Sequence, residues 1–501
     1  MVSSVSQTRA FTTVFLVEMW ERFGFYGMAA LLVLFMVERA GFSDGEANLV
    51  WGAFAAIVYS APAIGGWIGD KLLGTRRTMF VGAIVLVLGY LMLALPDDHI
   101  SFMYASLGVI VVGNGLFKAN AANLVRRIYE GDDARIDSAF TIYYMAVNVG
   151  STISMLATPW IKDRWGWHAA FAVCCAGMIV GVLNFLTRYR SLVHVGSAPD
   201  NEPIGWRRIG AVALGSVALW LVSTFVLAHK GLAVACVYAA GIAVVAIFAY
   251  MLVKCARPER AGLVAASILV LQSILFFVFY QQMSTSLTLF ALRNVDPAFS
   301  FAGVALFTWS AAQFQALNPI WIMLLSPLLA LGYTRLARGG GDFSVAVKFT
   351  IGFAAVAAGF FIYALGGRYA VEGRVSSWFM VWGYGFYSLG ELLVSGLGLA
   401  MVARYIPARM SGFMMGAYFI ATGISQYLGS VVANFAQLPP QGLSATESLR
   451  LYVRFFTELG WLATAGAVLT MLLLPLMQRL SNQHRQCTQE QATSPLVIAA
   501  E

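Results

Sequence analysis

The feature that most constrains this chain is a series of apolar stretches, each about twenty residues long, that recur from Phe11 almost to Met477. A stretch of this length crosses a hydrocarbon core of roughly 30 Å as a helix. Of the 501 residues 59% are hydrophobic and only 11% are charged, and the mean hydropathy is +0.75. This composition excludes the soluble globular classes. We therefore predict an all-α polytopic membrane protein.

The positions of the basic residues test the number of spans. The predicted spans centre near Phe25, Ile57, Leu86, Val112, Ala146, Gly177, Leu219, Ile242, Phe277, Ser326, Ala355, Leu392, Ile420 and Ala467, which makes fourteen. Cytoplasmic loops are enriched in Lys and Arg. Of the 32 basic residues, 21 fall on the side of the N-terminus and nine on the other side, while Arg22 and Lys118 lie inside spans. This bias predicts an even number of spans with both termini cytoplasmic.

A linker containing Gly, Pro and charged residues separates the first six spans from the rest. The two spans that follow it carry no interior charge, and we interpret them as a lipid-facing structural hairpin. The tail after Leu480 is polar, and we expect it to be disordered. The predicted divisions are an N-terminal six-helix bundle (1–190), a cytoplasmic linker (191–208), an inserted two-helix hairpin (209–255), a C-terminal six-helix bundle (256–478) and a cytoplasmic tail (479–501).

Five ionisable residues interrupt the apolar spans, namely Glu18, Glu21, Arg22, Lys118 and Glu391. A charge at a helix centre costs about 2.5–3.5 kcal/mol on insertion, so such residues usually have a function. Spacings of three and four place Glu18, Glu21 and Arg22 on one side of the first helix. Two carboxylates and one guanidinium leave a group that can take a proton or be neutralised by Lys118. Buried structural ion pairs are the alternative interpretation.

Lys118 lies among small residues, which let a helix approach its neighbours closely. It can face the first-helix carboxylates or a bound anion, and the alternative is that it extends to the cytoplasmic surface. In the fifth span Tyr144 and Asn148 share a helix face and offer neutral donors and acceptors. Hydrogen bonding between helices is the alternative interpretation, and the pair taken alone favours it.

The second half of the chain supplies Gln282, Asn318 and Glu391 within its spans. Glu391 is the only ionisable residue deep in that half. An acid in one half, facing a base with acids in the other half, makes a dipolar cavity between them. Such a cavity is complementary to a zwitterion, and amino acids and short peptides are the obvious candidates.

Other classes of function lack the residues that they need. The five cysteines have no metal-ligand spacing, and no compact basic domain is present to bind nucleic acid. Gly339–Gly341 lacks the lysine and the preceding strand of a phosphate-binding loop. The histidines are scattered singly, so an enzyme is not predicted. These five residues are His99, His168, His194, His229 and His484.

Several motifs resemble those of the proton-coupled oligopeptide transporters, a branch of the major facilitator superfamily that includes bacterial dipeptide and tripeptide permeases. The string Glu18–Gly27 resembles the family's first-helix E-x-x-E-R-F signature. Phe140–Ser151, Gln315–Pro319 and Glu391–Ala400 are similar to its fifth-, eighth- and tenth-helix patterns. The resemblance covers the chain from Glu18 to Leu476. The residues that resemble the superfamily's cytoplasmic loop motif are Gly66, Asp70, Arg76 and Arg77.

The resemblance implies two six-helix bundles and a proton-driven symporter that imports di- and tripeptides by alternating access across a bacterial inner membrane. It also implies that no cofactor is needed beyond the proton gradient, that the partners are peptides, protons and the lipid bilayer but no nucleic acid, and that the protein is a monomer. The implied proton-coupling residues are Glu18, Glu21, Arg22, Lys118 and Glu391. The implied peptide-binding residues are Arg22, Tyr26, Tyr59, Lys118, Tyr144, Asn148, Phe277, Gln282, Asn318, Glu391 and Tyr418.

Within that set, Arg22 and Lys118 would hold the peptide carboxylate, and Glu391 with Asn148 and Asn318 would hold the amino end. The chain departs from the family where Phe277 and Tyr418 replace tryptophan and where Gln272 or Gln281 replaces an acid. Side-chain preference and gating could differ accordingly. A transporter of the same build for another small zwitterionic or anionic solute is the alternative function.

Overall fold

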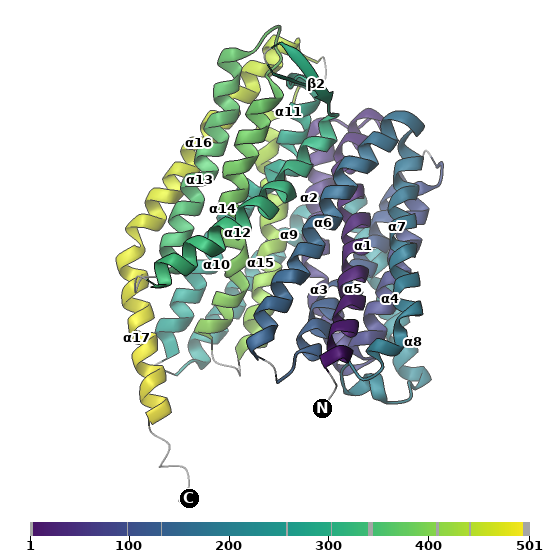
Figure 1. The fold of residues 1–501 in the computed structure, drawn as a ribbon, viewed down its shortest axis with the longest axis vertical. Helices are drawn as coiled ribbons and strands as arrows, with labels where there is room; N and C mark the ends of the chain where they lie inside the picture. Colours follow the sequence, from purple (N-terminus) through teal and green to yellow (C-terminus); the bar gives the residue numbers. More distant parts are fainter. Residues whose placement is uncertain are drawn as a thin grey trace, which may run out of the picture.

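The computed structural model describes residues 4–97, 99–131, 133–256, 259–301, 303–338, 344–406, 410–439 and 442–493, and Gly339–Gly341 lie outside these ranges. The chain is almost entirely helical because helices satisfy every backbone hydrogen bond within lipid. Helices from the two halves of the chain form two bundles that lie side by side (Figure 1). The first and last described helices reach the same end of the molecule, here called the terminal end.

The first bundle is formed by the helices that precede the linker. They are α1 (Ser4–Glu38), α2 (Asp44–Ser60), α3 (Pro62–Lys71), α4 (Thr75–Ala94), α5 (Ile100–Ile128), α6 (Asp133–Trp165) and α7 (Trp167–Thr187). Pro62 at the start of α3 breaks the second span in two. Glycines bring the helices together: a Cβ on Gly150 of α6 would lie 2.3 Å from the Met19 carbonyl oxygen of α1. Helix α1, which carries three of the predicted charges, is therefore in close contact with α6.

The linker contains two short 3₁₀ helices, η1 (Tyr189–Leu192) and η2 (Ala198–Asn201), and is bound to the loop before α4. Arg76 donates to the carbonyls of Leu192 and Val193, at 2.7 and 2.6 Å. Asp200 accepts from the backbone N–H of Arg76 at 3.1 Å and so caps the start of α4. Two arginines of the predicted loop motif, Arg76 and Arg77, thus fix the linker.

The second bundle contains more interruptions than the first. Its elements are α10 (Arg260–Tyr280), η4 (Gln281–Ser284), α11 (Ser286–Asn294), β1 (Ala298–Phe301), β2 (Val304–Thr308), η5 (Ala311–Ala316), α12 (Leu317–Arg338), α13 (Val345–Gly366), η6 (Gly367–Tyr369), α14 (Ser377–Tyr405), α15 (Ser411–Ala433), η8 (Asn434–Ala436), α16 (Ala445–Leu472) and α17 (Leu474–Thr493). The strands β1 and β2 pair antiparallel, with Ala298 opposite Thr308 and an irregularity at Phe299.

The expectation of a disordered tail is wrong for its first part. Helix α17 continues to Thr493, well beyond Leu480. Contacts hold it against the bundle, since Tyr405 donates to Ser481 at 3.4 Å and its ring lies 5.6 Å from that of His484. The tail is polar because its helix lies outside the apolar part of the bundle. Composition alone does not distinguish such a polar helix from a disordered segment.

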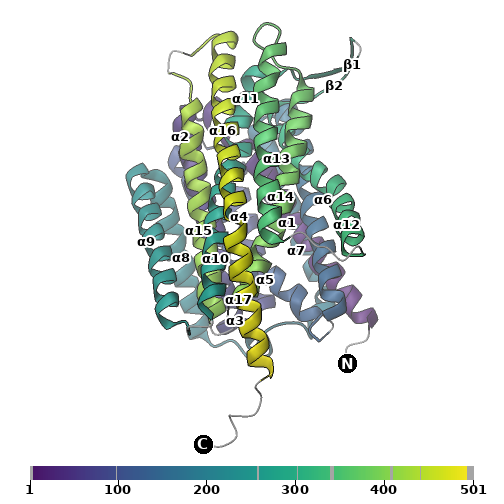
Figure 2. The same ribbon diagram turned by 90° about the vertical axis from the view of Figure 1, so that its left-hand side faces the viewer.

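The inserted hairpin consists of α8 (Trp206–Ala228) and α9 (Lys230–Lys254), which lie at one edge of the molecule (Figure 2). In the most apolar stretch of α8 only 22% of the residues are buried by protein, and in that of α9 only 11%. The corresponding share for α1 is 83%. Helix α8 packs on α5 and helix α9 packs on α15. The hairpin therefore contacts both bundles while most of its surface faces outward.

Twelve segments of the described residues are long and apolar enough to cross a membrane. Helices α14 and α15, of 29 and 23 residues, are not among them and include side chains that the structure does not describe. With those two helices the arrangement accommodates the fourteen predicted spans. The count itself stays a prediction.

Candidate functional site

The first-bundle cluster comprises Glu18, Glu21, Arg22 and Lys118, and its three α1 residues are 3% exposed or less. The Arg22 Nε atom lies 3.3 Å from Glu18 Oε1 and also donates to Glu21. Asn114 of α5 donates to the second oxygen of Glu21 at 3.3 Å. One guanidinium thus contacts two carboxylates on the same helix face, as the spacing predicts. The cluster has no further ion pair among the described residues.

Lys118 on α5 does not form an ion pair with any described residue. Its Nζ atom lies 4.5 Å from the centre of the Tyr59 ring, in a cation–π contact. It nevertheless interacts electrostatically with Glu21, Glu18 and Arg22. Lys118 is therefore a second cation that faces the cluster without being neutralised by it. It is half-buried and lies four residues after Asn114, on the same face of α5.

Three polar atoms of the first-bundle site are buried without a hydrogen-bond partner among the described residues. They are Glu18 Oε2, Arg22 Nη2 and Asn114 Oδ1. An unsatisfied buried polar atom costs about 1–3 kcal/mol, and a native structure tolerates this where a ligand completes the bonding. The free Nη2 atom of Arg22 is a donor that fits a carboxylate oxygen.

The second-bundle cluster comprises Glu391, Asn318 and Ser388 and contains one charge. Asn318 of α12 donates to Glu391 Oε2 at 2.7 Å and to Ser388 Oγ at 3.1 Å, both on α14. Tyr280, at the end of α10, interacts electrostatically with Glu391. No described basic residue forms an ion pair with Glu391. The hydrogen bond that its carboxylate accepts thus comes from a neutral donor, Asn318.

Three tyrosines interact with charged residues of the two clusters. Tyr26 of α1 and Tyr59 of α2 each interact electrostatically with both Arg22 and Glu391, and Tyr144 of α6 interacts with Glu391. Arg22 also lies 5.9 Å from the centre of the Tyr26 ring. Tyr26 and Tyr59 thus lie within electrostatic range of both the cation of one bundle and the acid of the other.

The other predicted peptide-binding residues are less directly connected to this region. The Asn148 amide donates to the Tyr144 carbonyl of its own helix at 2.8 Å. The Gln282 amide donates to the Gly429 carbonyl of α15 at 2.9 Å and accepts from Ser286 at 2.7 Å. Phe277 contacts the Tyr280 ring at 6.0 Å, centre to centre. Tyr418 is buried on α15 and contacts Phe419.

Four residues of the site were not given a role from the sequence. Asn114 donates to Glu21, and Ser388 accepts from Asn318, the partner of Glu391. Tyr143 and Tyr280 interact electrostatically with Glu18 and Glu391, respectively. Each is a neutral residue in an apolar helix, where most such side chains bond their own backbone. A spacing of four between Asn114 and Lys118 was the one available signal, since it puts them on one helix face.

The molecule is closed at the end opposite the termini, here called the far end. Arg293 of α11 binds Asp44 of α2 through two contacts of 2.6 Å. Asn48 of α2 donates to Asn434 of η8 at 3.1 Å. Gln315 of η5 donates to the Ala30 carbonyl of α1 at 3.3 Å. All three contacts join the two bundles, so access from this end requires that they break.

Two bundles with a charged site between them define a transporter of the major facilitator fold, as the sequence predicts, and not an enzyme. The model of the POT family matches residues 76–449. The chain belongs to this family. Among the described residues, no group of three or more His, Cys, Asp or Glu could hold a metal ion.

The similarity to known proteins extends over nearly the whole chain. Dipeptide and tripeptide permease A of Proteus mirabilis is 40% identical over 481 residues, covering 96% of this chain and 97% of that protein. The permease of the same name from Escherichia coli K12 is 39% identical, covering 96% of this chain and 95% of that protein. Tetrameric PepTSo2 is 54% identical with a TM-score of 0.87, covering 95% of this chain and 100% of that one. A peptide transporter POT solved with sulfate is 26% identical with a TM-score of 0.79, covering 94% and 95%.

Proposed function

We propose that this protein is a proton-coupled symporter that imports di- and tripeptides by alternating access. The observation that supports this most strongly is the dipolar site. Arg22 with a free Nη2 atom and the unpaired Lys118 lie in the first bundle, and Glu391 lies in the second. Tyr26 and Tyr59 interact electrostatically with both Arg22 and Glu391. A peptide with a free carboxylate and a free ammonium group matches both ends. The relatives named as dipeptide and tripeptide permeases support the same substrate class.

In this proposal the peptide carboxylate binds Arg22 and Lys118. The ammonium group binds Glu391, with Asn318 and Asn148 as neutral acceptors nearby. Tyr26, Tyr59 and Tyr144 line the peptide backbone and side chains, and Phe277, Gln282 and Tyr418 complete the pocket on the side of the second bundle. The set is taken from the sequence resemblance, and the contacts of Glu391 with Asn318 support its central pair.

Proton coupling is assigned to Glu18, Glu21, Arg22, Lys118 and Glu391. Arg22 binds Glu18 and Glu21 at the same nitrogen, so a proton on either carboxylate weakens that carboxylate's hold on the guanidinium. A freed guanidinium binds the peptide carboxylate more readily. Peptide and proton therefore favour each other's binding, which is the thermodynamic requirement of symport.

Alternating access then requires the far end to open when the other end closes. The Asp44–Arg293 and Asn48–Asn434 contacts are the ones that this step breaks. We assign the far end to the outside of a bacterial inner membrane, with both termini cytoplasmic, because the terminal end carries most of the Lys and Arg residues. A reporter that is active only in the cytoplasm should be active when it is fused after Glu501. A reporter that is active only outside the inner membrane should be inactive at the same position.

The finer organisation is part of the same proposal. We assign the bundles to residues 1–190 and 256–478, the linker to 191–208, the hairpin to 209–255 and the tail to 479–501.

The gradient of protons is the driving force and no cofactor is required. We take the functional unit to be the monomer, although PepTSo2 was solved as a tetramer. Light scattering of the purified protein tests that assignment.

Uptake by proteoliposomes tests the proposed function. Dialanine and trialanine should accumulate under an inward proton gradient, and a proton ionophore should abolish the accumulation. Empty liposomes and liposomes with the Glu391→Gln variant are the controls. If neither peptide enters, the proposal is wrong.

The same assay distinguishes peptide transport from the alternative function, the transport of another small zwitterionic or anionic solute. Alanine, an organic acid and acetylated dialanine are offered as competitors of labelled dialanine. Competition by alanine alone would indicate an amino-acid transporter, and competition by the organic acid would show that Glu391 does not contribute to selection. Competition only by unmodified peptides supports the proposed substrate class.

A further inference from the structure

The hairpin leaves cavities where it meets the bundles. Trp220 of α8 donates to the Ala105 carbonyl of α5 at 3.0 Å, which fixes one helix to the first bundle. Helix α9 packs on α15 of the second bundle instead. A groove between α2, α9 and α15 separates these two contacts. The groove is therefore bounded by both bundles and by the hairpin.

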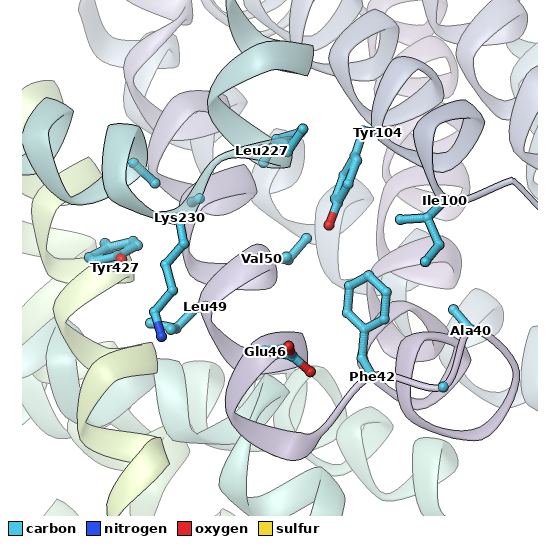
Figure 3. A pocket seen from close by; sticks show the side chains of 14 residues that line it. Ala40, Phe42, Glu46, Leu49, Val50, Ile100, Tyr104, Leu227, Lys230 and Tyr427 are labelled. Atoms are coloured by element: carbon cyan, nitrogen blue, oxygen red, sulfur yellow. The ribbon is translucent and has the colours of Figure 1, made fainter.

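The upper part of the groove is a cavity of about 410 Å³ near the far end (Figure 3). Its polar groups come from three helices: Glu46 of α2, Tyr104 of α5 and Lys230 at the start of α9. In Figure 3 the Tyr104 hydroxyl and the Glu46 carboxylate point into the same space, and the Lys230 side chain runs along the hairpin side of the cavity, with its ammonium beside Leu49. The apolar lining includes Phe42, Leu49, Val50, Ile100, Leu227 and Tyr427.

The acid and the base of this cavity are not paired with each other. Glu46 uses Oε2 to accept from the backbone and hydroxyl of Ser43, at 2.9 and 2.7 Å, and its Oε1 has no bond among the described residues. Lys230 has no hydrogen bond or ion pair among those residues. The two charges interact only at longer range. Their separation leaves room for a ligand that carries both signs.

A second cavity of about 160 Å³ continues the groove toward the middle of the molecule. Both cavities are lined by Ala53, Ala233 and Tyr427, so they adjoin. The lower one is lined almost entirely by apolar side chains and reaches Ser60 on α2. From Glu46 to Ser60 the helix rises about 21 Å, more than half of a hydrocarbon core of about 30 Å. The groove is thus long enough for one acyl chain.

We propose that this groove binds a phospholipid whose headgroup carries a primary ammonium, as phosphatidylethanolamine does. Lys230 and the Tyr104 hydroxyl hold the phosphate, and Glu46 holds the ammonium group. One acyl chain lies along Ala53 and Ala233 between α2 and α9. A dissolved peptide also carries both charges, but it does not account for the apolar lower cavity. On the proposed orientation the lipid belongs to the outer leaflet.

The bound lipid contacts both bundles at a point close to the contacts that close the far end. Tyr427 is one of its neighbours on α15, and Asn434, which binds Asn48, lies seven residues further along the chain. A ligand that fits the groove only when α2 and α15 are together favours the closed arrangement. This gives the hairpin a role beyond a structural one, because it supplies Lys230 and one wall of the groove.

Lipid retention measured by native mass spectrometry tests the proposal on the full chain. The protein is purified in detergent and titrated with phosphatidylethanolamine or phosphatidylcholine, whose quaternary ammonium cannot donate a hydrogen bond. The parent should retain the ethanolamine lipid about fivefold better, and Glu46→Gln should remove this preference. Lys230→Met loses the phosphate contact and should reduce the retention of both lipids. Gln at position 46 retains the helix cap. Equal retention of the two lipids by the parent overturns the proposal.

Matched variants separate the groove from the general surface. Lys254→Met removes a basic residue from the other end of α9, and should leave retention unchanged. Ala240→Phe fills the lower cavity and should reduce retention, whereas Ala239→Phe, on the exposed side of the same turn, should not. Melting temperature confirms that each variant is folded. Displacement of the lipid by dialanine would show that the cavity takes peptide, and would also overturn the proposal.

Discussion

The two clusters of the site hold their carboxylates in opposite ways. In the first bundle, Glu18 and Glu21 share Arg22, and a second cation, Lys118, faces them. In the second bundle, Glu391 accepts a hydrogen bond from a neutral donor, Asn318. In the first arrangement, a proton on a carboxylate or an anion on the guanidinium can replace one of the ion pairs of Arg22. The second contains one acid with no cationic partner among the described residues, so in the proposed function it binds the ammonium end of a zwitterion.

Replacing Arg22 should cause the largest loss of uptake, because it removes the residue that distinguishes the first cluster from the second. Lysine keeps the charge but loses the planar group that bonds two carboxylates and still offers Nη2. We expect Arg22→Lys to lower the uptake of dialanine by about 100-fold or more, since breaking a buried pair costs about 3–5 kcal/mol. Arg164→Lys, at an exposed arginine over Trp160, is the control for the same substitution and should transport normally. Normal uptake by Arg22→Lys would remove the role of its guanidinium.

Glu391→Gln tests the other cluster by removing the charge while keeping the shape and the bond from Asn318. We expect uptake of dialanine to fall about 10- to 100-fold, because a hydrogen bond to a charged group contributes about 1.5–3 kcal/mol. The discrimination against acetylated dialanine should disappear. Competition assays with both peptides measure this. Unchanged discrimination in the variant would show that the amino end binds elsewhere.

A matched pair of asparagines sharpens the difference between the clusters. Asn318 donates to Glu391 at 2.7 Å, and Asn114 donates to Glu21 at 3.3 Å beside a guanidinium. We expect Asn318→Leu to lower uptake about tenfold and Asn114→Leu only about threefold, because Glu21 keeps Arg22. Initial uptake rates at saturating proton gradient compare the two. Equal losses would mean that both carboxylates depend on neutral donors alike.

The smallest expected effect concerns the cation–π contact of Lys118. Tyr59→Phe keeps the ring under the Lys118 ammonium, and Tyr59→Leu removes it. We expect Tyr59→Leu to weaken the apparent affinity for dialanine about two- to fivefold relative to Tyr59→Phe, in line with about 0.5–1 kcal/mol for such a contact. The half-saturation concentration of uptake measures this difference. If the two variants behave alike, the ring face does not position Lys118.

Much of the membrane architecture could be predicted because its signals are local. Hydrophobic runs define helices wherever lipid is the solvent, and charges within them are costly enough to mark the site. Glu18, Glu21 and Arg22 were placed on one helix face by spacing alone, and the structure brings Arg22 into contact with both acids. The tail was misjudged because polarity does not separate a solvated helix such as α17 from a disordered segment.

The sequence by itself determined that the chain crosses the membrane many times, which residues are charged within it, and which face of the first helix carries three of them. Only the tertiary structure decided the partners: Asn318 for Glu391, Tyr59 for Lys118, and Asp44 for Arg293. Spacing fixes neighbours within one helix, but these pairs join segments up to 249 residues apart. Their contact depends on how helices pack, which in turn depends on shapes that no local pattern encodes.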